Sequence, residues 1–165
     1  VDFAKAFDLV DHNVLMQKMI DYDFPPQVTS WSLSFLQDRE QFVKINDCLS
    51  FVTRINYGCP QGALSGPNNF KLLINDLRFR LSYIKYVDDT SVVSVSNDPS
   101  DNSLQLSLNE LAEWCTANTM RINTVKTKEM VVCFGKQFDA SRLPTLAING
   151  SMIERVSCFK LLRIF

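Results

Sequence analysis

The spacing of apolar residues predicts helices and strands that interleave along the whole chain. Apolar residues recur at helical spacing over residues 12–23, 26–37, 69–81 and 102–117. Runs rich in β-branched and aromatic residues predict strands at residues 1–3, 41–46, 51–57, 82–87, 90–95, 130–134, 145–148 and 152–156. Because helices and strands do not alternate strictly, we expect an α+β fold whose antiparallel sheet carries its helices on one face.

Turn-forming residues separate these elements. Asn149-Gly150 is typical of a two-residue hairpin turn, and residues 47–50 connect the two strands of an earlier predicted hairpin. Glycine and proline recur between residues 58 and 67, which predicts a loop there. The pair Pro25-Pro26 ends one helix and suits the first turn of the next.

The composition is that of one globular domain. The chain has 165 residues, of which 46% are hydrophobic, and no apolar run reaches membrane-spanning length. The five cysteines are scattered singly, without zinc-site spacing, which favours a reduced intracellular compartment. The net charge of −1 argues against tight nucleic-acid binding by the chain alone, because such binding depends on phosphate neutralisation.

Two adjacent carboxylates, Asp88 and Asp89, lie between the strands predicted at 82–87 and 90–95. An acidic turn can bind a hard divalent cation, although Asp-Asp is also ordinary turn chemistry. Asp2 lies on another predicted strand that can neighbour this hairpin. Three carboxylates on neighbouring strands suffice for two magnesium ions, about 3.5–4 Å apart, in phosphoryl transfer.

Five segments, in the order in which they occur, resemble the motifs of reverse transcriptases from non-LTR retrotransposons of the jockey and LINE type. They are residues 1–8 with 10–12, residues 58–67 continuing into 73–77, residues 86–89, Trp114 with Asn123 and residues 126–128, and residues 159–162. Each segment alone is weak evidence, whereas five in order over nearly the whole chain are highly specific. The resemblance implies a partial reverse transcriptase domain over residues 1–165, with the polymerase palm at 1–135 and a palm–thumb hairpin region at 136–165.

The resemblance assigns the catalytic roles to four residues. Asp2 and Asp88 are the expected metal ligands, with Asp89 in support. Lys126 matches a lysine near the triphosphate, where a cation can neutralise or protonate the leaving pyrophosphate. The expected cofactor is a pair of Mg²⁺ ions, with Mn²⁺ as the alternative.

The resemblance also assigns the residues that contact nucleotide and primer. Phe7 is expected beneath the incoming sugar, where its ring would clash with a 2′-hydroxyl and so select deoxynucleotides. Gln61 and Gly62 match the loop that touches the incoming nucleotide and the template, and glycine permits close approach of the backbone. The start of the hairpin that grips the primer end is expected at Phe159, Lys160, Leu161 and Leu162.

The expected partners are an RNA template, a DNA primer and deoxynucleotides, with no membrane. An apolar strand that begins one residue before Asp2 looks cut, so we expect a fragment that lacks the fingers and thumb. Such a fragment is expected to be inactive or nearly so by itself, because Asp2 would lie at a frayed end. The family implies action in the nucleus, although no localisation signal is visible.

Three other identities remain open. A group II intron maturase is a related enzyme, and an RNA-dependent RNA polymerase is disfavoured by Phe7 and by Tyr86-Val87 in place of a glycine before the aspartates. A catalytically dead remnant that serves as a binding scaffold is the rival from another class. It is favoured by departures from the family pattern at Asn68-Asn69, at residues 63–65 and at Arg163, where the family has glycine.

Several conspicuous residues have ordinary structural explanations. Asp8 and Asp11 are expected in caps or turns, and His12 is expected to be structural or exposed. Trp31 and Trp114 lie on apolar helical faces and are expected in the core. Cys59 lies inside the loop motif without an activating base nearby, so it is not a candidate nucleophile.

Overall fold

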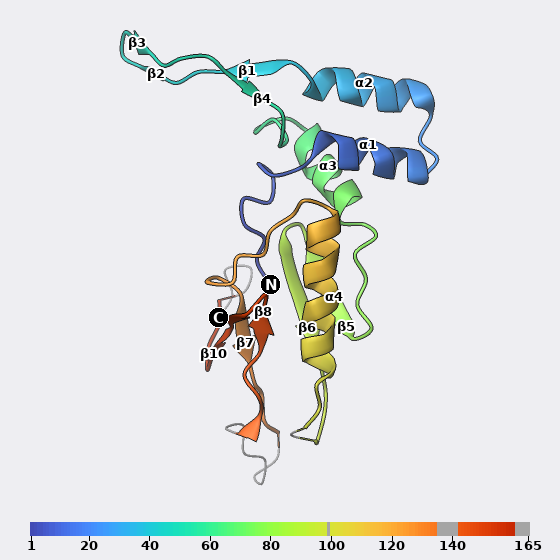
Figure 1. Ribbon diagram of the computed structural model, residues 1–165, viewed down its shortest axis with the longest axis vertical. Helices are drawn as coiled ribbons and strands as arrows, with labels where there is room; N and C mark the ends of the chain where they lie inside the picture. Colours follow the sequence, from blue (N-terminus) through green and yellow to red (C-terminus); the bar gives the residue numbers. More distant parts are fainter. Residues whose placement is uncertain (99, 135–141, 161–165) are drawn as a thin grey trace. The chain divides into compact units, whose positions relative to one another are not determined.

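The computed structural model describes residues 1–98, 100–134 and 142–160, and these divide into two compact units (Figure 1). One unit comprises Lys5–Asp76, and the other combines Val1–Ala4 with the chain from Leu77 onward. The predicted boundary between residues 135 and 136 falls in a stretch outside the described residues and stays a prediction.

Three helices form the core of the unit Lys5–Asp76. They are α1 (His12–Asp21), α2 (Pro26–Leu36) and α3 (Ser65–Leu73), and α1 packs against both of the others. The helix α1 begins after Asp11, whose carboxylate accepts hydrogen bonds from the backbone N–H groups of Asn13 and Val14 at 2.8 and 3.2 Å. The buried side chains shared among the helices include Leu15, Met19, Leu36, Phe70 and Leu73. Burial of this apolar face stabilises the helices more than their own propensity does.

The prediction of a helix over residues 69–81 is wrong at both ends. The helix α3 begins at Ser65, so Gly66 and Pro67 lie in its first turn. The first backbone N–H groups of a helix have no intrahelical partner, so proline is tolerated there. Beyond Leu73 the chain leaves the helix, and Leu77 and Phe79 are buried while Arg78 between them is exposed, as in extended backbone.

The same unit contains the predicted first hairpin. Figure 1 shows it as one long ribbon built from β1 (Arg39–Gln41) with β4 (Thr53–Ile55), and β2 (Lys44–Ile45) with β3 (Cys48–Leu49). The turn is Asn46-Asp47 rather than residues 47–50, because Asn46 adopts a φ of 53°, which asparagine tolerates. The expectation that Trp31 lies in the core is wrong: the side chain is 66% exposed and stacks on Phe35.

The second unit contains the acidic hairpin. Its strands are β5 (Ser82–Tyr86) and β6 (Asp89–Val93), which pair antiparallel with Tyr86 opposite Asp89. The helix α4 (Ser103–Ala117) buries Leu108, Leu111 and Cys115, and it contacts β8. The predicted amphipathic helix is therefore confirmed.

The remaining strands are β7 (Lys128–Met130), β8 (Ala147–Ile148), β9 (Ser151–Met152) and β10 (Glu154–Val156). The β8–β9 turn is Asn149-Gly150, with φ values of 50° and 78°, as the sequence predicts. The strand predicted at 130–134 is instead β7, which pairs in parallel with β10. Glu129 and Arg155 are opposite each other in this pairing and form an ion pair with an N–O distance of 2.8 Å, which fixes the register.

The α+β class is confirmed, but the sheet differs from the prediction. The described strands form five two-stranded sheets, of which the β7–β10 pair is parallel and the others are antiparallel. The placement of the helices on one face of a single palm sheet stays a prediction. Within the described ranges, no helix is both long and apolar enough to cross a membrane.

The burial of two cysteines leads to a prediction about thiol reactivity. Burial raises the pKa of the Cys59 thiol to about 11 and that of Cys115 to about 12, whereas Cys48, Cys133 and Cys158 are exposed. At pH 8, a pKa of about 11 in place of the ordinary 9.0 leaves Cys59 with roughly one hundredth of the thiolate of an exposed thiol. Iodoacetamide should therefore modify the three exposed thiols at least about 100-fold faster than the two buried ones. Mass spectrometry of tryptic peptides checks this, with labelling in urea as the control, and equal native rates at all five positions would contradict the burial.

Candidate active site

The Asp2 segment lies between β6 and residues 121–123. On one side, the carbonyl of Val1 accepts a hydrogen bond from the Thr90 N–H at 3.3 Å. On the other side, the Asp2 carbonyl accepts from the Asn123 N–H at 2.8 Å, and Phe3 forms an antiparallel bridge with Ile122. Hydrogen bonds on both sides therefore hold residues 1–3, although they form only an isolated bridge at Phe3 and not the strand that the sequence predicted. Asp2 is adjacent to the β6 end of the acidic hairpin.

Asp88 and Asp89 lie at the tip of the β5–β6 hairpin. Because Tyr86 pairs with Asp89, the two-residue turn consists of Val87 and Asp88. Val87 has a φ of 55°, a left-handed conformation that is unfavourable for a β-branched residue. Backbone strain of this kind is concentrated at functional sites, where the surrounding structure holds it in place.

A cavity of about 750 Å³ in this unit brings several predicted site residues together. Asp2, Asp89 and Lys126 line it, and so do Phe159 and Lys160 from the predicted primer grip. Its apolar lining includes Val92, Leu104, Leu108, Leu146 and Ile153. The cavity thus joins five residues from four separate segments. Asp88 does not line it, and Leu161 and Leu162 lie outside the described residues.

Two carboxylates that line the cavity are of the chemical kind that Mg²⁺ prefers. Asp2 and Asp89 offer carboxylate oxygens from one cavity, and Mg²⁺ takes only one or two protein carboxylates, with water and phosphate oxygens completing its shell. The hydroxyl of Thr90, which is 2% exposed and lines the same cavity, has no hydrogen-bond partner in the described part of the chain. No group of three acidic, histidine or cysteine side chains that could hold a metal exists among the residues described. The site therefore offers two carboxylates on one cavity, with Asp88 next to Asp89 in the chain.

The other predicted nucleotide-contacting residues belong to the unit Lys5–Asp76. The Phe7 ring is half-buried and packs against Phe70 of α3, with ring centroids 5.0 Å apart. The Phe7 carbonyl accepts a hydrogen bond from the Cys59 N–H at 2.8 Å, and Gln61 Nε2 donates to Asp8 Oδ1 at 3.4 Å. The first and second motifs are therefore joined within this unit.

Gly58 and Gly62 of the loop at residues 58–67 differ in whether a side chain would fit. Gly58 has a φ of 87°, and a Cβ atom there would lie 2.9 Å from the carbonyl oxygen of Asp8. Gly62 has a φ of 80°, but a Cβ atom there would meet no atom within 4 Å. Gly58 thus serves the fold, whereas the open space at Gly62 leaves room for a ligand to approach the backbone.

The residues expected to be ordinary are structural. Asp11 caps α1, and the buried His12 ring donates from Nε2 to the Gly58 carbonyl at 2.8 Å. Trp114 is half-buried beside Phe3, with ring centroids 6.4 Å apart. Sequence reasoning missed the close approach of Gly58 to Asp8 and the hydrogen bond from the Asp2 N–H to the Thr127 hydroxyl, because both join residues distant in the sequence.

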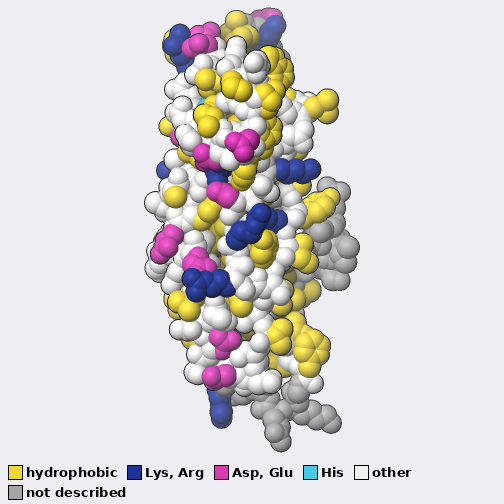
Figure 2. Space-filling model, turned by 90° about the vertical axis from the view of Figure 1, so that its right-hand side faces the viewer, with side chains coloured by type: hydrophobic (Ala, Val, Ile, Leu, Met, Phe, Trp, Pro, Cys, Tyr) yellow, Lys and Arg dark blue, Asp and Glu magenta, His cyan; other side chains and the backbone are white. Residues whose placement is uncertain are grey.

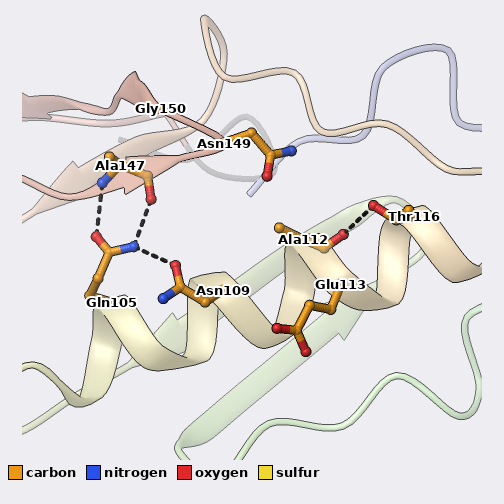
Figure 3. A pocket seen from close by; sticks show the side chains of 8 residues that line it. All are labelled: Gln105, Asn109, Ala112, Glu113, Thr116, Ala147, Asn149 and Gly150. Carbon is orange, nitrogen blue, oxygen red and sulfur yellow. Dashed lines mark hydrogen bonds between the residues drawn. The ribbon is translucent and has the colours of Figure 1, made fainter.

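A second cavity, of about 440 Å³, lies between α4 and the β8–β9 turn (Figure 3). The Gln105 side chain there accepts from the Ala147 N–H at 2.9 Å and donates to the Ala147 carbonyl at 2.7 Å, as Figure 3 shows. These bonds satisfy the edge of β8 and hold it on the helix. None of the predicted site residues lines this cavity.

The face that Figure 2 shows carries charges of both signs. On the face that Figure 2 shows, Lys and Arg side chains are interspersed with Asp and Glu and form no continuous basic strip. A nucleic-acid backbone needs a row of cations for tight binding. This face therefore offers no such row.

Comparison with known proteins gives a consistent result. Residues 1–161 match the family model described as reverse transcriptase (RNA-dependent DNA polymerase). The chain is 28% identical over 176 residues to the RNA-directed DNA polymerase from mobile element jockey of Drosophila melanogaster, with 99% of the chain and 19% of the relative covered. It is also 28% identical over 179 residues to a retrovirus-related Pol polyprotein from type-1 retrotransposable element R1 of Bradysia coprophila, with 100% of the chain and 17% of that relative covered.

Proposed function

Because the chain belongs to the reverse transcriptase family of RNA-directed DNA polymerases, we propose that it forms the catalytic palm of such an enzyme from a non-LTR retrotransposon. In that role it adds deoxynucleotides to the 3′-hydroxyl of a DNA primer on an RNA template. The observation that carries the proposal is the single cavity lined by Asp2, Asp89 and Lys126 together with Phe159 and Lys160.

The carboxylates of Asp2, Asp88 and Asp89 would hold two Mg²⁺ ions, with Mn²⁺ as the alternative. When bound, such ions stabilise the charge that develops on the attacking and leaving oxygens. The exposed Lys126 ammonium on the same cavity neutralises or protonates the leaving pyrophosphate. Asp2 is held by backbone hydrogen bonds on both sides of its segment, which suits a group that must not move during the reaction.

The loop of the second motif and Phe7 select the nucleotide. Gln61 and Gly62 are exposed, and Gly62 leaves its backbone open to the incoming nucleotide and template. The Phe7 ring is backed by the fully buried Phe70, so it cannot easily swing aside for a 2′-hydroxyl. Phe159 and Lys160, followed by Leu161 and Leu162, grip the primer end.

The remaining partners are supplied by the rest of a longer protein. The chain spans 19% of the length of the jockey relative, so fingers and thumb are the proposed partners of this palm. A nuclear site of action follows from the proposed class of element. The proposal is tested in a chimera, here called the jockey chimera, in which residues 1–165 replace the aligned region of the jockey enzyme. Primer extension on an RNA template supports the proposal, and its absence in a folded jockey chimera contradicts it.

The second candidate is a catalytically dead remnant that acts at most as a binding scaffold. It is favoured by the absence, among the described residues, of three acidic groups placed to hold a metal. It predicts a folded jockey chimera that binds primer–template without extending it. Extension and binding measured on the same preparation therefore separate the two candidates.

Phe7→Ala is expected to relax sugar selection. Removing the ring opens the space beneath the sugar, so the jockey chimera should incorporate ribonucleotides at least about tenfold more efficiently relative to deoxynucleotides, a ratio within reach of a single steric contact. The measurement is the ratio of kcat/KM for a ribonucleotide and its deoxy counterpart. Phe7→Tyr keeps the ring and serves as the control. An unchanged ratio in a folded Phe7→Ala protein would remove Phe7 from the nucleotide site.

A further inference from the structure

The backbone N–H of Asp2 finds its hydrogen-bond acceptor on a side chain and not on the backbone of a neighbouring strand. Along a strand, the N–H and C=O groups of successive residues point to opposite sides. Val1 bonds to Thr90 of β6, so the polar backbone groups of Asp2 face residues 121–127 instead. The Asp2 carbonyl accepts from the Asn123 N–H at 2.8 Å, as in an ordinary ladder. The Asp2 N–H, however, donates to the side-chain hydroxyl of Thr127 at 3.1 Å.

The chain turns directly after Asn123, so the ladder of backbone hydrogen bonds ends there. It supplies no backbone acceptor for the Asp2 N–H. Two further bonds close this turn: the Thr127 N–H donates to the Asn123 carbonyl at 2.8 Å, and the Lys126 N–H donates to Asn123 Oδ1 at 3.2 Å. Thr127 is 3% exposed, so little water is available to replace its hydroxyl. One turn therefore holds both the N–H and the C=O of Asp2.

The same turn carries Lys126, which lines the cavity together with Asp2. Asn123 accepts from Lys126 through its side chain and donates to Asp2 through its backbone. A displacement of the turn would thus move the carboxylate and the ammonium together. The sequence analysis assigned a role to Lys126 but none to the residue that follows it.

We propose that Thr127 is a positioning residue for Asp2, and that the turn 123–127 fixes Asp2 and Lys126 relative to each other. This inference rests on the proposed function. A hydroxyl is required because it accepts the Asp2 N–H, whereas a methyl group of the same size cannot. A valine at position 127 preserves packing and leaves that N–H without an acceptor, so the Asp2 backbone loosens at the reacting centre.

The test compares Thr127→Val with Thr127→Ser, which keeps the hydroxyl. The matched control is Thr116→Val on α4, which removes a hydroxyl bonded to the Ala112 carbonyl at 3.0 Å, away from the cavity. In the jockey chimera, Thr127→Val should lower kcat by about 10- to 100-fold, the range for residues that orient a ligand-bearing group, with KM for deoxynucleotides nearly unchanged. Thr127→Ser should restore most of the rate, and Thr116→Val should leave it unchanged.

A second readout does not depend on activity. In the 165-residue chain, NMR hydrogen exchange of the Asp2 amide should be at least about tenfold faster in Thr127→Val than in wild type or Thr127→Ser. If the wild-type jockey chimera fails to extend primers but this pattern holds, the proposed function fails and the positioning contact stands. An unprotected wild-type amide, or equal exchange in all three proteins, would overturn the inference. So would a Thr127→Ser rate as low as that of Thr127→Val.

Discussion

Replacing Asp2 by asparagine should reduce primer extension by the jockey chimera at least about a thousandfold. Asparagine keeps the shape of the side chain but removes a negative charge from the lining of the cavity, where we propose that a divalent cation binds. A bound metal supplies several kcal/mol of charge stabilisation, and each 1.4 kcal/mol is tenfold in rate. Single-nucleotide incorporation under saturating primer–template and nucleotide measures the loss in kcat.

The matched control for this substitution is Asp23→Asn. Asp23 is exposed between α1 and α2, and its φ of 57° is one that asparagine also accepts. The control should keep the wild-type rate, which shows that the loss follows from the position of the charge and not from its number. A rate within tenfold of wild type for Asp2→Asn would remove Asp2 from the catalytic centre.

Gly58→Ala should destabilise the fold by about 3 kcal/mol or more. A left-handed conformation costs a residue with a Cβ atom about 1–2 kcal/mol. At this position the Cβ atom would also lie 2.9 Å from the Asp8 carbonyl oxygen, so backbone must move. Movement disrupts the bond from the Gly58 N–H to the Val10 carbonyl at 2.7 Å and the His12 bond to the Gly58 carbonyl, each costing about 1–3 kcal/mol when lost in the interior.

The variant Gly62→Ala measures the conformational cost of a positive φ without the steric clash that alanine would cause at Gly58. Gly62 has nearly the same φ, but its Cβ atom would meet open space, so only the conformational cost of about 1–2 kcal/mol remains. Urea unfolding of the 165-residue chain, followed by circular dichroism, compares the two variants with wild type. Equal losses at both positions would show that the close approach of Gly58 to Asp8 does not exist in solution.

Periodicity predicted the elements that depend on local sequence. The helices α1, α2 and α4 and the turn at Asn149-Gly150 follow from apolar spacing and from residues that tolerate positive φ. The start of α3 was not predictable in this way, because Gly66 and Pro67 are usually loop residues and are tolerated only in the first turn. Local rules therefore fail where one residue type suits two structures.

Strand partners and exposure depend on the rest of the molecule. The parallel pairing of β7 with β10 rests on ion pairs of Glu129 with Arg155 and of Lys128 with Glu154, residues that lie more than twenty positions apart. Trp31 belongs to an apolar helix whose exposed side was indistinguishable from its buried side by periodicity. Neither outcome follows from a local window of sequence.

The candidate site was predictable as far as motif order extends. Order and residue type predicted Asp2, Asp88, Asp89 and Lys126 as site residues. Three of these line one cavity, and their roles stay predictions. The hydroxyl of Thr127 as the acceptor for Asp2 was not predictable, because it requires the register of two segments 125 residues apart. Non-local hydrogen bonds of this kind leave no periodic signal in the sequence.

Primer extension by the jockey chimera on an RNA template with Mg²⁺ and deoxynucleotides tests the central claim most directly. The wild-type jockey chimera should make full-length complementary DNA, and the Asp88→Asn, Asp89→Asn double variant should make none while still binding primer–template. Extension by both proteins would show that the acidic turn is not catalytic. A folded wild-type jockey chimera that binds primer–template and adds no nucleotide would contradict the catalytic account and support the remnant.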